Sequence, residues 1–362
     1  MEMAPIGAVF SFGNDPQTVN CRIMSTKAMI VGSSGTKLTD DERAFFASER
    51  PWGFILFARN IDTPDQVRAL VEDFRRCVDR AYAPVLIDQE GGRVQRLRPP
   101  HWTNYPPAAS IGALFEQDPD AGKRASWLMS RLHAFDLSAL GINVDCLPVL
   151  DVPAEDGHAV IGDRAYGLTA EQVTILGAEA CSGLQAGGVM PVIKHIPGHG
   201  RARADSHLEL PVVETDLATL KEVDFAPFNA LSSAPMAMTA HVVYTALDAE
   251  NPATTSASII SDIIRGEMSF DGLLMSDDVS MQALSGDFGD RTRAIFRAGC
   301  DIVLHCNGDM SEMTAVAAQT PELQGLALRR AEDAMRGAGQ SDGSQEQDCR
   351  EEFAGLLGNA VS

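Results

Sequence analysis

The stretch MPVIKHIPGHG, residues 190–200, joins a short apolar run directly to a segment rich in proline, glycine and histidine. Apolar and β-branched residues favour a buried strand, and the glycines and prolines predict a loop after it. We expect no helix or strand to hold residues 194–207, because Pro197, Gly198 and Gly200 interrupt both kinds of structure. The pattern therefore indicates a buried strand that ends in a loop of titratable side chains.

The same pattern recurs along the chain, and helical patterns separate several of the runs. The apolar runs are AMIVGSSG (28–35), GFILFARN (53–60), APVLIDQEGG (83–92), INVDCLPVLD (142–151), MPVIKHIPGHG (190–200), PMAMTAHVVY (235–244), GLLMSDD (272–278) and DIVLHCNGD (301–309). Strands that are apolar nearly throughout suit a parallel sheet covered on both faces. Eight such units predict a single (β/α)8 TIM-type barrel, whose functional residues follow the carboxyl ends of the strands.

Two helices are marked clearly by their capping residues. One is expected to begin at Thr63 and Pro64, an N-cap followed by proline at the first helical position. Another opens at Thr169, with Gln172 at capping-box spacing, and closes near Gly187. We expect the barrel to occupy residues 24–336, between an N-terminal arm (1–23) and a polar, acidic C-terminal tail (337–362).

Composition narrows the class of partner. The 362 residues carry a formal net charge of −21, which disfavours nucleic acid or an anionic membrane as a partner. The seven cysteines are scattered without a C-x-x-C pair, no basic residue precedes Arg22, and no apolar run has the length of a membrane span. These features predict a cytoplasmic protein, and none of them indicates an obligate protein partner.

Two motifs at strand ends carry carboxylates. In SDD, residues 276–278, Asp277 is either a helix cap or a nucleophile or base at the barrel mouth. In IDQEGGRVQRLR, residues 87–98, the charges either decorate a glycine turn or bind a ligand. In the second case Asp88 would accept hydrogen bonds from hydroxyls, and an arginine such as Arg96 would hold a carboxylate or carbonyl.

The histidine-rich loop allows three interpretations. His195, His199, Asp205 and His207 include ordinary zinc ligands, but Pro197 prevents the first two from sharing a helical face as an H-x-x-x-H pair would. A phosphate cradle lacks the G-x-x-x-x-G-K-[ST] motif. We favour acid–base catalysis without a metal or cofactor, because Asp205 stands where it can orient His207 and raise its proton affinity. No G-x-S-x-G motif supplies a serine nucleophile, and Asp277 is available instead.

Several of these segments together resemble a known family. They are DQEGGRVQR (88–96), IGDR (161–164), KHIPGHG (194–200), DSH (205–207) and SDDVSM (276–281). In this order and spacing, from about Met29 to His305, they are similar to the family 3 glycoside hydrolases, and within them to the bacterial β-N-acetylglucosaminidases of cell-wall recycling. Many members of this family carry a second domain after the barrel. Only a short segment follows the last barrel motif here, so this chain resembles the single-domain members of the family.

The resemblance implies a retaining exo-β-N-acetylglucosaminidase that removes terminal β-1,4-linked GlcNAc from a small-molecule substrate, a cell-wall muropeptide, through a covalent glycosyl-enzyme. It assigns the nucleophile to Asp277 and the general acid/base to His207, with Asp205 as the partner of the histidine. The residues that match the family's sugar-binding positions are Asp88, Arg96, Arg164, Lys194 and His195.

Rival functions remain open at this point. A broader β-glycosidase is the nearest alternative. A metal-dependent amidohydrolase would normally carry H-x-H after the first strand, which AMIVGSSG lacks. A non-catalytic sugar-binding protein on the same fold would be expected to have lost Asp277 or His207, and both are present.

Overall fold

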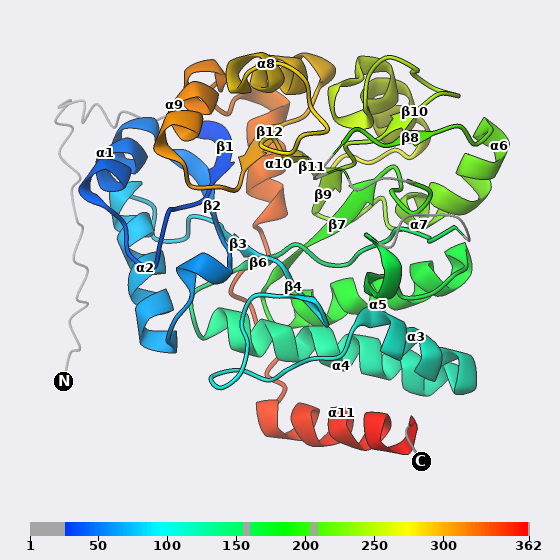
Figure 1. Ribbon diagram of the computed structural model, residues 1–362. Helices are drawn as coiled ribbons and strands as arrows, with labels where there is room; N and C mark the ends of the chain where they lie inside the picture. The colour runs from blue at the N-terminus through cyan, green and yellow to red at the C-terminus, as the bar shows by residue number, and fades with distance from the viewer. Residues whose placement is uncertain (1–25, 155–159, 203–205, 207–208, 361–362) are drawn as a thin grey trace, which may run out of the picture.

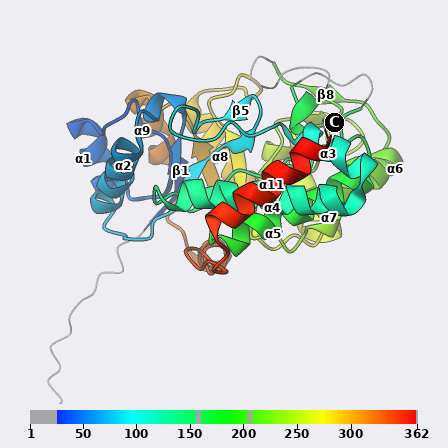
Figure 2. The same ribbon diagram turned by 90° about the horizontal axis from the view of Figure 1, so that it is seen from below.

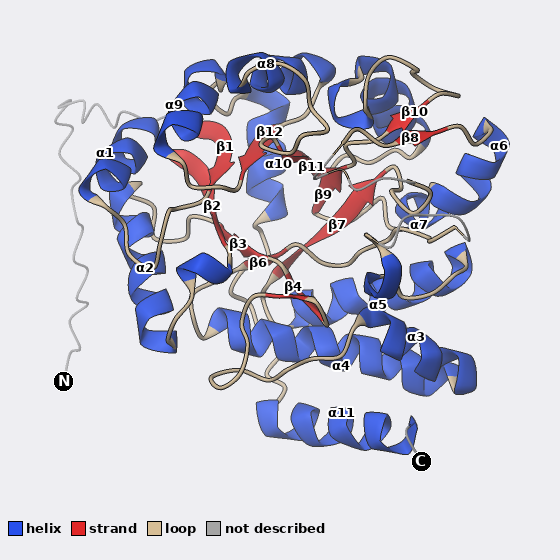
Figure 3. Cartoon of the chain, in the orientation of Figure 1, coloured by secondary structure: helices blue, strands red, loops and turns tan. Residues whose placement is uncertain are grey.

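The computed structural model describes residues 26–154, 160–202, 206 and 209–360. Within them, eight parallel strands close into a barrel in the order β1-β12-β11-β9-β7-β6-β3-β2, with helices around it (Figures 1 and 3). The strands are β1 (Lys27–Val31), β2 (Pro51–Leu56), β3 (Val85–Ile87), β6 (Val144–Asp145), β7 (Met190–Ile196), β9 (Met236–Thr239), β11 (Leu273–Asp278) and β12 (Ile302–His305). Each lies within one of the predicted apolar runs or begins just before it, and the predicted (β/α)8 barrel is confirmed.

The outer layer consists mainly of helices that follow the strands. The longer ones are α1 (Asp40–Glu49), α2 (Pro64–Cys77), α3 (Ala108–Gln117), α4 (Pro119–Ser138), α5 (Ala170–Ala186), α8 (Phe288–Ala298), α9 (Met310–Gln319), α10 (Gly325–Ala334) and α11 (Glu346–Ala360). The shorter turns are η1 (Ala58–Asn60), η2 (Gly162–Arg164), α6 (Leu217–Thr219), η3 (Leu220–Asp224), α7 (Ala226–Ala230), η4 (Ala253–Thr255) and η5 (Ile259–Glu267). No helix of the described chain combines the length and apolar character needed to cross a membrane.

Local sequence explains where the predicted helices begin. Thr63 is the N-cap of α2, directly before Pro64, and its side chain accepts a hydrogen bond from the Gln66 amide. The helix buries an apolar stripe that includes Val67 and Phe74. Helix α5 starts after the Thr169 cap and ends before Gly187, as predicted.

Two apolar layers hold the barrel together. Inward-facing side chains from all eight strands, such as Ile30, Val192 and Met275, fill the barrel, so the interior is a packed core. Alternate strand residues, such as Val31 and Phe54, pack outward against the helices. The polar side chains that follow the strands are therefore displayed at the carboxyl end of the barrel.

One expectation about the histidine-rich stretch is wrong. Residues 194–207 were predicted to lie wholly outside regular structure, but β7 continues to Ile196. The strand extends because Lys194 and Ile196 still pair with Met238 and Thr239 of β9. Lys194 and the adjacent His195 therefore belong to the barrel wall rather than to a loop.

Three further elements complete the chain. A small antiparallel hairpin, β4 (Gln89–Gly91) and β5 (Val94–Gln95), follows β3, and a short parallel pair, β8 (Val212–Val213) and β10 (Val243–Tyr244), lies beside the later strands. Near the C-terminus, α11 runs beside α4 (Figure 2). Arg350 of α11 is 2.8 Å from Asp136 of α4, and Cys349 and Phe353 are buried in the outer apolar layer.

Candidate active site

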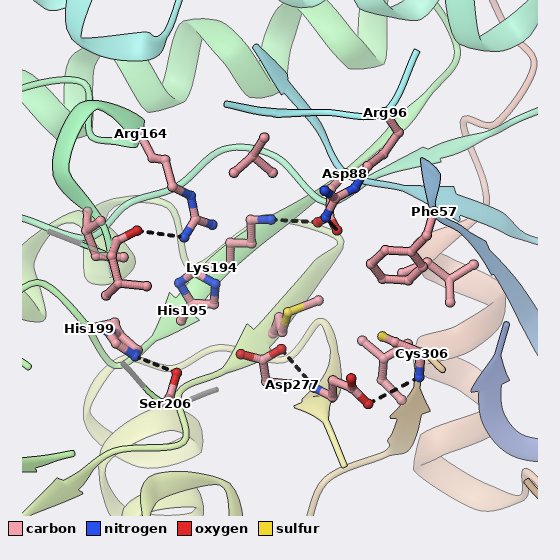
Figure 4. Close-up of a pocket in the computed structure, with 17 residues that line it drawn as sticks. Phe57, Asp88, Arg96, Arg164, Lys194, His195, His199, Ser206, Asp277 and Cys306 are labelled. Atoms are coloured by element: carbon pink, nitrogen blue, oxygen red, sulfur yellow. Dashed lines mark hydrogen bonds and ion pairs between the residues drawn. The ribbon is translucent and has the colours of Figure 1, made fainter. Parts of the chain in front are cut away.

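A pocket at the carboxyl end of the barrel brings most of the predicted site residues together (Figure 4). Its lining includes Asp88, Arg96, Arg164, Lys194, His195 and Asp277, which come from segments far apart in the sequence. The two other predicted catalytic residues, Asp205 and His207, lie outside the described residues.

Asp88 is held between two cations. Its Oδ1 atom lies 2.9 Å from Nζ of Lys194, and its Oδ2 atom lies 2.9 Å from Nη2 of Arg96. Burial alone would raise the pKa of Asp88, but the two cations outweigh burial and hold this pKa below its usual range. The carboxylate is therefore charged and held in one orientation in the lining of the pocket.

Glu90 forms a second charged pair beside the first. The Nε and Nη2 atoms of Arg164 each lie 2.8 Å from a different oxygen of Glu90, and Lys194 Nζ lies 2.7 Å from Glu90 Oε1. Burial would raise the pKa of Glu90, yet Arg164 and Lys194 lower it to about 2. Lys194, only 2% exposed, thus joins the carboxylates of Asp88 and Glu90.

Asp151, at the end of the run after β6, organises the histidines. Its Oδ2 atom lies 2.7 Å from Nδ1 of His195, and its Oδ1 atom accepts hydrogen bonds from the main-chain amides of His195 and His199. Burial would raise the pKa of Asp151, but His195 and His199 lower it to about 2. The His195 ring is therefore fixed by a charged acceptor, as in a carboxylate–histidine pair.

His199 lines the pocket from the loop after β7. Burial lowers its pKa to about 4, so the imidazole is neutral near pH 7. Its Nε2 atom lies 3.2 Å from the hydroxyl of Ser206, and Gly198, at φ +136°, allows the chain to turn between the two histidines.

Asp277 is the next-to-last residue of β11 and lies between the histidine pair and Cys306 in Figure 4. Its Oδ1 atom accepts a hydrogen bond of 2.8 Å from the amide of Asp278. The Asp278 carboxylate accepts hydrogen bonds from the amides of Ser280 and Cys306, so it fastens the loop after β11 to β12. The two adjacent carboxylates thus occupy different environments.

The pocket wall also has an apolar part, which was not predicted from the sequence. It is formed by Ile55, Phe57, Val94, Val160, Ile161, Met238 and Leu304. The Arg96 guanidinium lies 5.0 Å from the centre of the Phe57 ring, a cation–π contact that extends the Asp88–Arg96 pair. A lining that combines apolar side chains with oriented polar groups suits a sugar ring, which has both apolar and hydroxyl surfaces.

Sequence reasoning also missed the roles of Glu90 and Asp151 as partners of site residues. Glu90 lies in β4, and Asp151 closes the apolar run INVDCLPVLD (142–151), which was the available signal. Their partners, Arg164 and His195, lie 74 and 44 residues further along the chain. Among the described residues, no group of three or more His, Cys, Asp or Glu side chains is arranged to hold a metal ion.

Similarity to known proteins agrees with this geometry. Residues 17–336 match the glycosyl hydrolase family 3 N-terminal domain. The chain is 39% identical over 283 residues to a beta-hexosaminidase of Alkalilimnicola ehrlichii (77% of this chain, 80% of that protein) and 40% identical over 278 residues to one of Methylococcus capsulatus (75% and 80%). The crystal structure of NagZ from Neisseria gonorrhoeae in complex with N-trifluoroacetyl-D-glucosamine superimposes with a TM-score of 0.82 at 30% identity, over 93% of this chain and 99% of that one. The chain is thus a glycoside hydrolase and belongs to glycosyl hydrolase family 3.

Proposed function

We propose that this enzyme is a retaining exo-β-N-acetylglucosaminidase. Asp277 attacks the anomeric carbon of a terminal β-linked GlcNAc while His207, oriented by Asp205, protonates the departing glycosidic oxygen. The C1–oxygen bond to the leaving group breaks as the bond from C1 to the Asp277 carboxylate forms. His207 then takes a proton from water, which attacks C1 and releases Asp277, so the configuration is retained.

The observation that carries the proposal is the position of Asp277 in the same pocket as a set of paired charges. Lys194 and Arg96 both pair with Asp88, and Arg164 and Lys194 both pair with Glu90. A free anion-binding site would present cations without such partners. The pairs instead offer oriented donors and acceptors to a neutral, hydroxyl-rich ring, with Asp88 as the main acceptor.

The names of related proteins support the substrate class. The two curated relatives are beta-hexosaminidases, and the Neisseria protein binds an N-acylated glucosamine. We extend the proposal to GlcNAc-containing muropeptides as natural substrates and to peptidoglycan recycling in the cytoplasm. The thiols of Cys77, Cys146, Cys181, Cys300, Cys306 and Cys349 are free, which is compatible with a reducing compartment.

A slow fluorinated N-acetylglucosaminide tests the covalent step. Reaction with this compound is expected to add one glycosyl unit to the protein, and peptide mapping should place it on Asp277. Labelling of another residue, or an unchanged protein mass during turnover, would contradict the proposed nucleophile.

Substrate comparison tests the specificity separately. Hydrolysis of an aryl N-acetylglucosaminide should greatly exceed that of the matching aryl glucoside, and an N-acetylglucosaminyl anhydro-muropeptide should lose a single GlcNAc by mass. Equal rates on both aryl glycosides would favour a broader β-glycosidase.

A further inference from the structure

Asp278 is fixed from both neighbouring strands of the barrel. On the β12 side, its Oδ1 atom accepts a hydrogen bond of 3.1 Å from the Cys306 amide. On the β9 side, its main-chain carbonyl oxygen lies 3.0 Å from Nε2 of His241. Because the Asp278 amide donates to Oδ1 of Asp277, these two contacts hold the main chain that orients the Asp277 carboxylate.

His241 can meet this carbonyl in one tautomer only. A carbonyl oxygen accepts but cannot donate, so Nε2 must carry the proton and Nδ1 must be an acceptor. The Thr254 hydroxyl has one proton to donate and two acceptors within reach: Nδ1 of His241 at 2.7 Å and the carbonyl oxygen of Ala240 at 3.0 Å. Because Nδ1 is the nearer acceptor, we assign the proton of Thr254 to it. The hydroxyl of Thr239 lies 2.7 Å from that of Thr254 and completes a chain of three side chains.

The three hydrogen-bonded side chains of His241, Thr254 and Thr239 are buried, and the mechanism proposed above gives none of them a role. His241, Thr239 and Thr254 are each 0% exposed. Burial lowers the pKa of His241, although the nearby negative charge of Asp277 opposes this shift, so the ring is neutral and its single proton is placed by its neighbours. In a dry environment, hydrogen bonds of this kind orient their members strongly.

We propose that His241 is a positioning residue: through the Asp278 carbonyl it holds the Asp277 carboxylate in its orientation for attack, and Thr254 and Thr239 fix the required tautomer. This inference rests on the proposed role of Asp277 as the nucleophile and names the residues that orient it. His241 acts through the main chain and takes no proton from the substrate.

The rate of covalent labelling by the fluorinated glycoside, with the site mapped by mass, tests the proposal. His241→Ala is expected to slow labelling of Asp277 and kcat by roughly 10- to 100-fold with little change in KM, because a misaligned nucleophile loses attack geometry rather than binding. His241→Gln, whose amide can still donate from a similar position, should recover part of the loss. Thermal unfolding of each variant confirms that it is folded.

A matched pair at position 254 tests the tautomer without opening a large cavity. Thr254→Val keeps the shape and removes the hydroxyl, so labelling should slow several-fold, whereas Thr254→Ser should stay near the wild-type rate. If Asp277 of the His241→Ala variant is labelled at the wild-type rate, the positioning role is overturned. If Asp277 of the Thr254→Val variant is labelled at the wild-type rate, the tautomer assignment is overturned. Failure of the wild-type enzyme to label Asp277 would instead reject the proposed function itself.

Discussion

The guanidinium of Arg164 donates to both carboxylate oxygens of Glu90, at 2.8 Å each, within a pocket wall where Glu90 is only 3% exposed. Bidentate geometry of this kind fixes both side chains in one plane. Since Lys194 also contacts Glu90, the pair couples η2 to the barrel wall at β7. Glu90 therefore stabilises the substrate pocket as a scaffold rather than as a reactant.

We predict that Glu90→Gln destabilises the enzyme by about 3 kcal/mol at pH 7, because it leaves two buried cations partly uncompensated. The pKa of Glu90 falls from its ordinary value of 4.5 to about 2 on folding. A lowered pKa contributes stability that is fully present above pH 4.5 and disappears as the pH falls toward 2. Urea unfolding at a series of pH values should show that the difference in the free energy of unfolding between wild type and variant decreases as the pH falls from 4.5 toward 2.

Exposed ion pairs provide the control for this measurement. Arg68 and Asp65 pair on the surface of α2, and Asp65→Asn should change stability by less than about 1 kcal/mol. If the difference in the free energy of unfolding between wild type and Glu90→Gln stayed constant from pH 7 to pH 3, the charged-pair explanation would be contradicted.

A second prediction concerns the close approach of two loops at Gly200. A Cβ atom there would lie 1.9 Å from the carbonyl oxygen of Val152, next to Asp151. Gly200→Ala must therefore displace main chain, and we expect a loss of about 1–3 kcal/mol in stability and roughly tenfold or more in turnover. Gly355→Ala on α11, where a Cβ meets nothing within 4 Å, should not lower either quantity. Equal behaviour of the two variants would show that the loops can separate freely.

The sequence was sufficient for the fold because the barrel depends on patterns that are local. Each strand is a short apolar run followed by polar or glycine-containing residues, and caps such as Thr63 mark helix starts. It was also sufficient to place Asp88, Lys194 and Asp277 at one end of the barrel, since parallel strands bring their carboxyl ends together.

What the sequence could not supply were relationships between distant segments. The extension of β7 through Lys194 depends on pairing with β9, and the partner of Arg164 depends on how η2 folds back onto the β4–β5 hairpin. The apolar wall around Phe57 is likewise formed by side chains whose runs look like ordinary core strands. These features arise from three-dimensional packing and leave no local pattern.

The proposed acid/base predicts a leaving-group effect. His207→Ala should slow release of the natural sugar by roughly 10²- to 10⁴-fold, because a poor leaving group needs protonation. Aryl glycosides with activated leaving groups need little protonation and should be affected far less. Steady-state rates on a series of aryl N-acetylglucosaminides check this, and a uniform loss across the series would exclude His207 as the general acid.

The final prediction separates chemistry from binding at Asp277. Asp277→Asn removes the nucleophilic charge but keeps the size of the side chain and an oxygen that can accept the Asp278 amide. We expect kcat to fall by roughly 10³-fold or more, because a neutral amide is a far weaker nucleophile than a carboxylate, while GlcNAc binding measured by calorimetry stays within a few-fold of wild type. Asp309→Asn, at the exposed cap of α9, should leave both quantities unchanged and controls for general effects of charge removal. Retained turnover in Asp277→Asn would mean that C1 is attacked by another group, whereas a parallel loss of binding and kcat would make Asp277 a binding residue.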